Sequence, residues 1–309
     1  MKIAITCGDP AGVGPEIIKR WLPSAAATGA TFAVFGPASW LSTLHPPAGI
    51  ELLPVGAEGY RATPGRPTVL GSEAALAAME EAANGCRAGR FSAVVTGPVS
   101  KIEMQRVGFR FPGQSEFFAD RWGGAPTMGF TGGRLRVVLA TWHVPLREVV
   151  NHLTREALER SVRHAVWLAR AEGCAEPRVA VCGLNPHAGE DGMLGREEGD
   201  HINPWLEMIR PQFPGVSHCL PGDTVFARAL KGEFDVVVAL YHDQGLAPLK
   251  TVDFDAAVNV TLGLAHIRTS PDHGTAFDIA GRGLASTTSF DNAVATAVKF
   301  SRYREGHPW

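Results

Sequence analysis

The sequence predicts an α/β protein that has two domains with mainly parallel sheets. Short runs rich in β-branched residues alternate with longer amphipathic runs, and several of the short runs are apolar without alternation. The first pattern is typical of strand–helix–strand units, and the second of strands buried on both faces. A chain of 309 residues is also long enough to build two such cores.

Strands and helices can be placed along the chain from this pattern. The expected strands are 2–6, 31–35, 92–96, 134–141, 178–183, 234–241 and 257–262. The expected helices are 15–22, 72–87, 154–172, 197–210, 223–231 and 288–303. In the second helix, Ser72 is the expected N-cap, and Ala75, Met79 and Ala83 follow at helical spacing.

A change of domain is expected between residues 112 and 126, where proline and glycine interrupt the pattern. We therefore assign residues 1–122 and 285–309 to a first α/β domain. Residues 123–284 form the second, which carries most of the candidate site residues. The Pro/Gly-rich stretch 54–71 is expected to be a surface excursion.

Composition excludes several classes of function. The formal net charge is -2, which gives no long-range attraction to nucleic acid or acidic membranes. The five cysteines form no CxxC pair, as expected for reduced thiols in the cytosol. No apolar stretch approaches the roughly 18 residues that a membrane span needs, and the start of the chain lacks a signal-peptide pattern. We expect a cytoplasmic protein that binds neither nucleic acid nor membrane.

Three of the expected strands are each followed by a histidine. His143 follows the strand 134–141, His187 follows 178–183, and His242 follows 234–241. Ligands bind at the carboxyl ends of parallel strands in open α/β sheets. Three imidazoles gathered there would suit Zn²⁺, Mn²⁺ or Co²⁺ with a position left open for substrate.

The alternative for each histidine is a turn cap or a hydrogen bond to a loop carbonyl. Their recurrence at one sheet edge favours the metal site over this structural role. Asp223, in the sequence Pro-Gly-Asp-Thr, is a candidate fourth ligand or a residue that orients one of the imidazoles.

Two glycine-rich loops are candidates for binding a dinucleotide. The first, residues 8–16, contains Gly12 and then Pro15, which suits the first position of a helix whose free N–H groups attract anions. The GxGxxG fingerprint is absent, because Ile17 stands where its last glycine would be. A tight strand–helix turn without a ligand is an equally good interpretation of this loop.

The second loop, residues 272–283, is rich in small residues that would let a flat ring approach the backbone. Asp278 could accept hydrogen bonds from an adenosine ribose and repel a 2′-phosphate, which favours NAD over NADP. Without further information, an aspartate near a helix end is the simpler interpretation.

Local positive charge is available for an anionic substrate at Lys250 and Arg268. A guanidinium presents a planar fork that matches phosphate or carboxylate oxygens. Asn259 lies inside an apolar strand, where a buried amide requires partners, either from a substrate or from the protein.

Residues 113–118 offer further polar groups. Gln114 and Ser115 could donate hydrogen bonds to an anionic substrate, although a serine followed by Glu116 equally suits a helix N-cap. Lys101 is either another cation of the site or a solvated residue at a helix start.

Several long motifs occur in one order along the chain. They are GDPAGVGPE at 8–16, VTGPVSK at 95–101, GQSEFF at 113–118, GLNPHAGEDG at 183–192, YHDQGLAPLK at 241–250 and IRTSPDHGTAFDIAGRG at 267–283. With these motifs the chain resembles the PdxA family of 4-hydroxythreonine-4-phosphate dehydrogenases nearly end to end.

The resemblance implies a homodimer of two-domain subunits with a fold like that of isocitrate and isopropylmalate dehydrogenases. The cleft would lie between the domains and the active site at the subunit interface. It implies oxidation of the C3 hydroxyl of a phosphorylated substrate, 4-phosphooxy-L-threonine, by NAD or NADP. Decarboxylation to 3-amino-2-oxopropyl phosphate would follow.

The resemblance also implies roles for residues of this chain. A divalent ion (Zn²⁺, Mg²⁺ or Co²⁺) would be held by His143, His187 and His242. Substrate would be bound by Gln114, Ser115, Lys250, Asn259 and Arg268. The cofactor would be bound by Gly12, His273, Gly274, Thr275 and Asp278. Apart from the resemblance, our own hypothesis is that Asp223 or Lys250, the expected catalytic residues, or a water molecule removes the proton of the hydroxyl.

The chain departs from the family at one place. Gln114 and Ser115 stand where typical members have His-Thr, and glutamine can neither carry positive charge nor shuttle a proton. The alternative substrates are phosphorylated four-carbon sugar acids, 4-phosphoerythronate or threonate 4-phosphate. A non-redox acyl- or phosphotransferase is a further alternative, which would need no three-histidine site. An inactive binding protein is disfavoured because the three histidines are retained.

Overall fold

The computed structural model describes residues 1–309 as two compact units. Unit 1 is Met1–Pro126 with Val258–Gly306, and unit 2 is Thr127–Ala257 with His307–Trp309. The sequence prediction assigned residues 258–284 to the second domain, whereas the structure has them in unit 1. The reason is a strand pairing: β11 (Ile267–Pro271) lies beside β4 (Ala93–Thr96), with Ile267 opposite Ala93.

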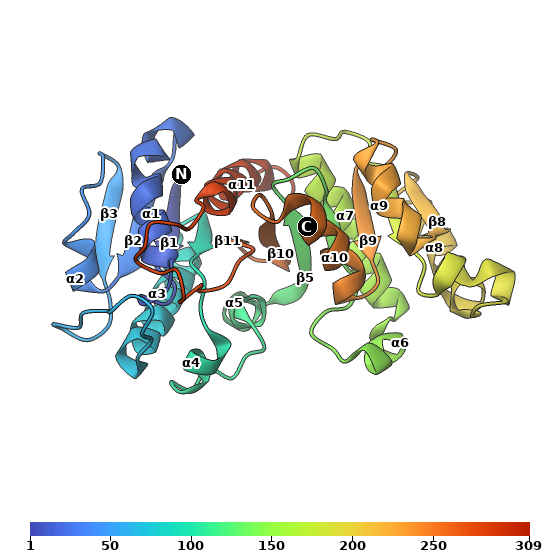
Figure 1. The fold of residues 1–309 in the computed structure, drawn as a ribbon. Helices are drawn as coiled ribbons and strands as arrows, with labels where there is room; N and C mark the ends of the chain where they lie inside the picture. The colour runs from blue at the N-terminus through green and yellow to red at the C-terminus, as the bar shows by residue number, and fades with distance from the viewer. The chain divides into compact units, whose positions relative to one another are not determined.

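The sheet of unit 1 has the strand order β3-β2-β1-β4-β11-β10 (Figure 1). All neighbours are parallel except β10 and β11, which are antiparallel. The remaining strands are β1 (Lys2–Thr6), β2 (Thr31–Gly36), β3 (Ile50–Pro54) and β10 (Val258–Leu264).

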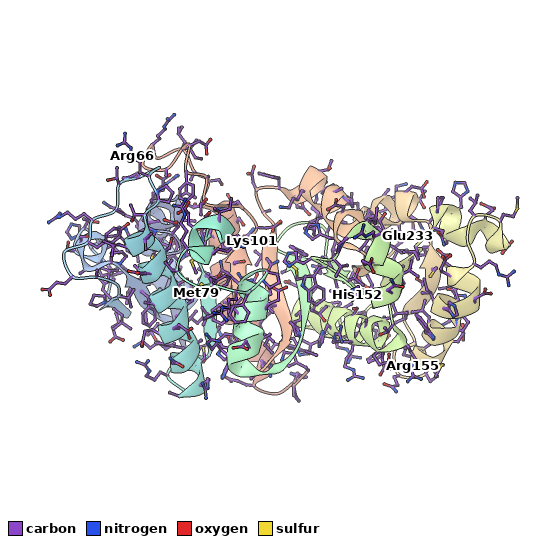
Figure 2. The ribbon with its side chains drawn as sticks, turned by 90° about the horizontal axis from the view of Figure 1, so that it is seen from below. Arg66, Met79, Lys101, His152, Arg155 and Glu233 are labelled. Atoms are coloured by element: carbon purple, nitrogen blue, oxygen red, sulfur yellow. The ribbon has the colours of Figure 1, made fainter.

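Helices cover both faces of this sheet because its strands carry apolar side chains on both sides. On one face, Trp21 of α1 packs edge-on against Phe32 of β2 and Phe290 of α11. On the other face, α3 and α5 enclose a core that includes Met79, which Figure 2 labels. The helices of unit 1 are α1 (Gly14–Trp21), η1 (Leu22–Thr28), α2 (Ala38–Leu41), α3 (Val69–Arg87), α4 (Lys101–Gln105), α5 (Gln114–Trp122) and α11 (Thr288–Arg304).

The sheet of unit 2 has the strand order β5-β6-β9-β7-β8. The pair β5–β6 is antiparallel, and the other neighbours are parallel. The strands are β5 (Gly124–Thr131), β6 (Val137–Leu139), β7 (Val179–Cys182), β8 (Val216–Leu220) and β9 (Val236–Ala239). Both units are therefore mainly parallel α/β structures, which confirms the predicted fold class.

In unit 2, α9 and α10 pack on one face of the sheet over residues such as Val137 and Ala239. The alternate residues Val138 and Val238 point to the opposite face, where α7 lies against β6 and β9. The helices are η2 (Leu146–Glu148), α6 (Val149–His152), α7 (Arg155–Ala171), η3 (Pro186–Gly192), the π-turn η4 (Glu198–Ile202), α8 (Asn203–Ile209), α9 (Gly222–Leu230) and α10 (His242–Asp253). None of the helices is long and apolar enough to span a membrane.

Two local predictions were wrong. Helix α3 begins at Val69, and its cap is Thr68, whose Oγ1 accepts from Gly71 N at 3.1 Å, so Ser72 lies inside the helix. The strand expected over 134–141 is limited to Val137–Leu139. Before the strand, Leu135 N donates to the buried carboxylate of Asp253 at 2.8 Å instead of to a neighbouring strand.

Candidate active site

The three histidine-bearing loops of unit 2 leave the same edge of the sheet. His143 follows β6, His242 follows β9 and His187 follows β7, and these strands are adjacent in the order β6-β9-β7. Because they are parallel, their carboxyl ends meet at one edge. The topology therefore places the three loops side by side.

The rings of His143 and His242 lie next to one another. Their centroids are 6.0 Å apart, and the two planes are inclined by 34°. Both line a cavity of about 300 Å³ whose other walls are Val144, Leu146, Val149, Tyr241 and Asp243. The structure thus brings together two of the three predicted metal ligands around a space that can hold a small ligand.

His187 does not join this pair within the chain, since no group of three His, Cys, Asp or Glu side chains is arranged to hold a metal ion. Its ring is exposed, and Nδ1 lies 2.7 Å from Glu190 Oε2. His242 is held in the same manner, with Nδ1 2.7 Å from Asp243 Oδ1.

These contacts suit metal ligands. A carboxylate on one ring nitrogen fixes the tautomer and leaves the other nitrogen, Nε2, to bind the ion. The side chains of His187 and His242 therefore fit as donors to Zn²⁺ or Co²⁺.

The candidate loops also contain all the residues other than glycine that have a positive φ. The non-glycine residues with positive φ are His143, His187, Ala188, Glu190, Asp191 and Ala276. Such conformations cost free energy and persist only where the surroundings enforce them, typically at functional sites. All six residues lie in the loops after β6, β7 and β11 that the sequence analysis singled out.

Asp223 and Lys250 also belong to unit 2. Asp223 is exposed in the first turn of α9, and Lys250 lies eight residues after His242 on α10. Gly222, which precedes Asp223, packs so that a Cβ there would lie 3.3 Å from Gln244 Nε2. The start of α9 is therefore next to the first turn of α10.

Unit 1 contains a polar cluster around the buried guanidinium of Arg268, which is 4% exposed. Its Nη1 donates to Asn259 Oδ1 at 2.8 Å and its Nη2 to Thr96 Oγ1 at 2.8 Å. Strand register explains the meeting: Thr261 is opposite Arg268, and Asn259, two residues before Thr261, shares its face. Burial lowers the pKa of Arg268 to about 10, so the side chain remains a cation at neutral pH.

Helix α5 places the two residues that depart from the family pattern beside this cluster. Ser115 Oγ lies 2.9 Å from Thr261 Oγ1, and Gln114 Nε2 donates to Gly97 O at 3.2 Å. Gln114 Oε1 is buried without a hydrogen-bond partner. The N-terminus of α5 and the Arg268 cation attract an anion, while the carboxylates of Glu116, in the first turn of α5, and Asp272 oppose this attraction. Lys101 is exposed at the start of α4 (Figure 2), where Ser100 caps the helix.

The two glycine-rich loops of unit 1 pack on each other. Val13 N donates to Thr275 O at 2.9 Å, and a Cβ on Gly12 would lie 2.8 Å from that same oxygen. Gly12 is therefore needed for the close approach of the two loops. The carboxylate of Glu16 accepts from Gly281 N at 2.7 Å and fixes the far end of the second loop.

The second loop has features that suit a ligand. His273 Nδ1 lies 3.0 Å from Gly274 O, while its Nε2 is buried without a hydrogen-bond partner. Gly274 and Asp278 are exposed, and a Cβ on Gly274 would meet open space. An unpartnered ring nitrogen beside an open backbone fits a polar, planar cofactor.

Sequence reasoning missed several residues that organise these sites. Thr96 and Thr261 had a weak signal, as polar residues in apolar strands, but their contact with Arg268 depends on register. Glu198, Gln244 and Glu16 act through backbone groups of other loops, which no spacing in the sequence reveals.

The fold belongs to a known class of α/β proteins. It aligns with isocitrate dehydrogenase from Methylococcus capsulatus with a TM-score of 0.53 at 17% identity, covering 99% of this chain and 88% of that chain, a likeness of fold alone. A family model described as "Pyridoxal phosphate biosynthetic protein PdxA" matches residues 20–297. The chain belongs to this PdxA family.

Relatives support the assignment over the whole length. The 4-hydroxythreonine-4-phosphate dehydrogenase of Bradyrhizobium diazoefficiens is 43% identical over 333 residues, which cover 97% of this chain and 96% of the relative. The crystal structure of 4-hydroxythreonine-4-phosphate dehydrogenase from Klebsiella pneumoniae is similar with a TM-score of 0.80 and 33% identity, and 98% of each chain is covered.

Proposed function

We propose that this protein is a metal-dependent, NAD(P)-linked dehydrogenase in pyridoxal phosphate biosynthesis. Its substrate would be 4-phosphooxy-L-threonine, oxidised at the C3 hydroxyl and decarboxylated to 3-amino-2-oxopropyl phosphate. The observation that carries the proposal is the pair of imidazoles, His143 and His242, in one cavity at the carboxyl edge of the sheet. The names of the relatives support the dehydrogenase role alone.

The metal site would use His143, His187 and His242. When bound, a divalent ion would supply polarisation of the substrate hydroxyl and stabilise negative charge as CO₂ leaves. The carboxylate of Asp243 holds the His242 ring, and that of Glu190 holds the His187 ring, in the tautomer that leaves Nε2 for the ion. Because His187 stands apart within one chain, we propose that the complete set forms in a homodimer with the active site at the subunit interface.

Substrate binding would rest on Gln114, Ser115, Lys250, Asn259 and Arg268. The N–H groups of Arg268 donate to neutral oxygens of Thr96, Asn259 and Thr261. The carboxylates of Glu116 and Asp272 also act on its positive charge from nearby. A phosphate or carboxylate beside Asn259 and Ser115 would be attracted by the positive charge that Arg268 keeps at neutral pH. Asp223 or Lys250, directly or through water, would accept the hydroxyl proton.

The cofactor would lie along Gly12, His273, Gly274, Thr275 and Asp278. When bound, the nicotinamide would accept a hydride from the substrate. Asp278 is exposed on this loop and can accept hydrogen bonds from a ribose, which favours NAD. The reduced cysteines and the charge balance further support action in the cytoplasm.

A second candidate substrate follows from Gln114 and Ser115. Gln114 is neutral and its Oε1 has no hydrogen-bond partner, so this position differs in charge from one that carries histidine. A four-carbon sugar acid such as 4-phosphoerythronate or threonate 4-phosphate lacks the amino group of 4-phosphooxy-L-threonine but retains its phosphate and carboxylate.

One assay distinguishes the substrates. Purified protein with added Zn²⁺, Mg²⁺ or Co²⁺ is given 4-phosphooxy-L-threonine or 4-phosphoerythronate, each with NAD and with NADP, and reduced nicotinamide is followed by absorbance. We expect the highest kcat/KM with 4-phosphooxy-L-threonine and NAD. A higher kcat/KM with 4-phosphoerythronate would favour the second substrate. No reduction in any combination would contradict the dehydrogenase proposal.

A further inference from the structure

Glu198 is a buried carboxylate at the centre of the His187 loop. It is 2% exposed, and Oε1 accepts from the backbone N–H groups of Leu184 and Asn185, each at 2.7 Å. Oε2 accepts from Asn185 Nδ2 at 3.0 Å. All three donors are neutral N–H groups of the segment that leads from β7 to His187. The carboxylate therefore fixes the start of this loop through hydrogen bonds from neutral groups and not through an ion pair.

The loop adopts a conformation that needs such support. Residues 187–191 are all left-handed, with φ values from 43° to 86°. Four of the five are not glycine, and each of these costs about 1–2 kcal/mol relative to the right-handed form. The segment would relax to another conformation unless contacts around it offset this cost.

Glu198 makes these contacts from inside the loop. A Cβ on Gly189 would lie 2.8 Å from Glu198 Oε2, and a Cβ on Gly183 would lie 3.3 Å from Oε1 and 2.8 Å from Ala188 Cβ. Both glycines are therefore required for the loop to close around the carboxylate. The carboxylate determines where the backbone passes on either side of His187.

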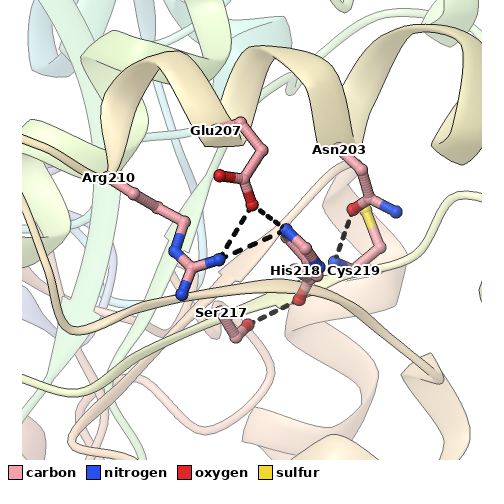
Figure 3. A network of polar contacts seen from close by, with 6 residues as sticks. All are labelled: Asn203, Glu207, Arg210, Ser217, His218 and Cys219. Atoms are coloured by element: carbon pink, nitrogen blue, oxygen red, sulfur yellow. Dashed lines mark hydrogen bonds and ion pairs between the residues drawn. The ribbon is translucent and has the colours of Figure 1, made fainter.

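Glu198 is itself held by the rest of unit 2. It begins the π-turn η4, which leads directly into α8. Helix α8 is fastened to β8, because Cys219 N donates to Asn203 Oδ1 at 2.9 Å and Glu207 contacts His218 (Figure 3). The anchor point of the loop is thus part of the packed α/β structure.

The anchored loop is also connected to the His242 helix. Gln244, two residues after His242, donates from Nε2 to Gly183 O at 2.6 Å. Gly183 directly precedes Leu184, which Glu198 binds. The position of the His187 loop is therefore set relative to His242 through Glu198 and Gln244.

We propose that Glu198 is a positioning residue for the metal site. Its carboxylate stabilises the left-handed loop in the metal-free protein and so presents the His187 imidazole in a preformed orientation. The inference rests on the proposed function, because it takes His187 as a metal ligand. Without Glu198 the ion would have to order the loop as it binds, which lowers its affinity.

The isosteric variant Glu198→Gln tests this directly. Its amide oxygen can still accept the two backbone N–H groups, but its NH₂ then faces Asn185 Nδ2. The side-chain amide of Asn185 cannot flip to relieve this, because its oxygen would then face the carboxylate of Glu197. In the wild type, Asn185 Nδ2 donates to that carboxylate at 2.7 Å. The matched control is Asp200→Asn, which removes one charge from the same π-turn. Asp200 is exposed, and its carboxylate accepts from Arg196 and not from the His187 loop.

Two measurements on the full-length protein are made. Hydrogen exchange of peptides covering residues 184–195 is measured without metal, and Co²⁺ affinity is measured from its visible absorbance. We expect Glu198→Gln to exchange faster in this segment alone and to bind Co²⁺ about 10- to 100-fold more weakly. Asp200→Asn should match the wild type in both. If Glu198→Gln cannot be purified, Gly189→Ala, which pushes a methyl against Oε2, should give the same changes.

The outcomes separate the two proposals. Unchanged exchange at 184–195, or unchanged Co²⁺ affinity, in Glu198→Gln would overturn the positioning role while the metal site stands. If the wild-type protein binds no Co²⁺, or binds it no more tightly than His242→Ala does, the proposed function fails. The positioning role of Glu198 then fails with it.

Discussion

Gln244 connects the ends of two neighbouring strands: its Nε2 donates to Gly183 O at 2.6 Å, and its Oε1 accepts from Leu240 N at 2.7 Å. Thr141 Oγ1 donates to the carbonyl of the same Leu240 at 2.7 Å. The loops after β6, β7 and β9 are therefore joined by side-chain hydrogen bonds. Each of these loops bears one of the three candidate ligand histidines.

Replacing Gln244 by Glu should break this connection while preserving size. The carboxylate still accepts from Leu240 N but places an oxygen against Gly183 O, where a donor is needed. We expect a loss of about 1–3 kcal/mol in the free energy of unfolding, measured by chemical denaturation. Gln212→Glu, an exposed change of the same charge, should lose less than about 0.5 kcal/mol. Equal stability of the two variants would show that the connection is not needed.

Arg268 should matter for the recognition of a phosphate or carboxylate group. Arg268→Lys keeps the charge but loses the planar fork that contacts Thr96, Asn259 and Thr261. We expect KM for the phosphorylated substrate to rise about 10- to 100-fold, equivalent to about 1.4–2.8 kcal/mol. Arg87→Lys, on the exposed end of α3, serves as the control. A KM equal to that of the wild type would exclude Arg268 from substrate binding.

Asp278 should set the choice between the two nicotinamide cofactors. Asp278→Ser removes the carboxylate that would accept from a ribose and repel a 2′-phosphate. We expect the ratio of kcat/KM for NAD to that for NADP to fall about tenfold, which corresponds to about 1.4 kcal/mol. Asp255→Ser, an exposed change outside the loop, should leave the ratio unaltered. An unaltered ratio in Asp278→Ser would place the ribose elsewhere.

His164 should make stability depend on pH. Burial, followed by the nearby charges of Arg160 and Arg163, lowers the pKa of its imidazole from 6.5 to about 3. The unfolded chain therefore binds the proton between these values and the folded chain does not, so stability is complete above pH 6.5 and falls as the pH drops toward 3. At pH 5 the loss from this group is about 2 kcal/mol.

The variant His164→Leu isolates this effect. Nδ1 of His164 is buried without a hydrogen-bond partner, so an apolar side chain forfeits no such bond. Urea denaturation at pH 7.5 and pH 5 should show a smaller loss of stability in the variant than in the wild type. An identical loss in both proteins would mean that other groups cause the acid sensitivity.

The sequence predicted those helices and strands whose pattern of apolar residues agrees with which of their residues are buried. Strands such as β1 and β7, and helices such as α7 and α11, lie within two residues of their expected bounds. Strand β5 was missed because it contains glycine and proline, and α10 was missed because Gly245 and Pro248 interrupt it. In both, tertiary packing overrides the local preference.

The residues of the candidate site could be predicted from the sequence, but most of their contacts could not. That each of the three histidines follows a strand can be read from the order of residues along the chain. That these strands are neighbours depends on the sheet order β6-β9-β7, which differs from their order in the chain. The distance between the rings of His143 and His242, and the meeting of Arg268 with Thr96, depend on strand register and loop conformation. The left-handed backbone at His187 has no signature in the residue types around it.

The most direct test of the whole account is metal-dependent reduction of NAD by the wild-type protein and by His242→Ala. Both are exhaustively chelated, supplied with 4-phosphooxy-L-threonine and NAD, and assayed before and after one equivalent of Co²⁺ or Zn²⁺ is added. We predict that chelated wild-type protein is inactive and recovers with metal, while the folded His242→Ala variant stays inactive. Full activity of the chelated wild type, or of His242→Ala, would contradict the account.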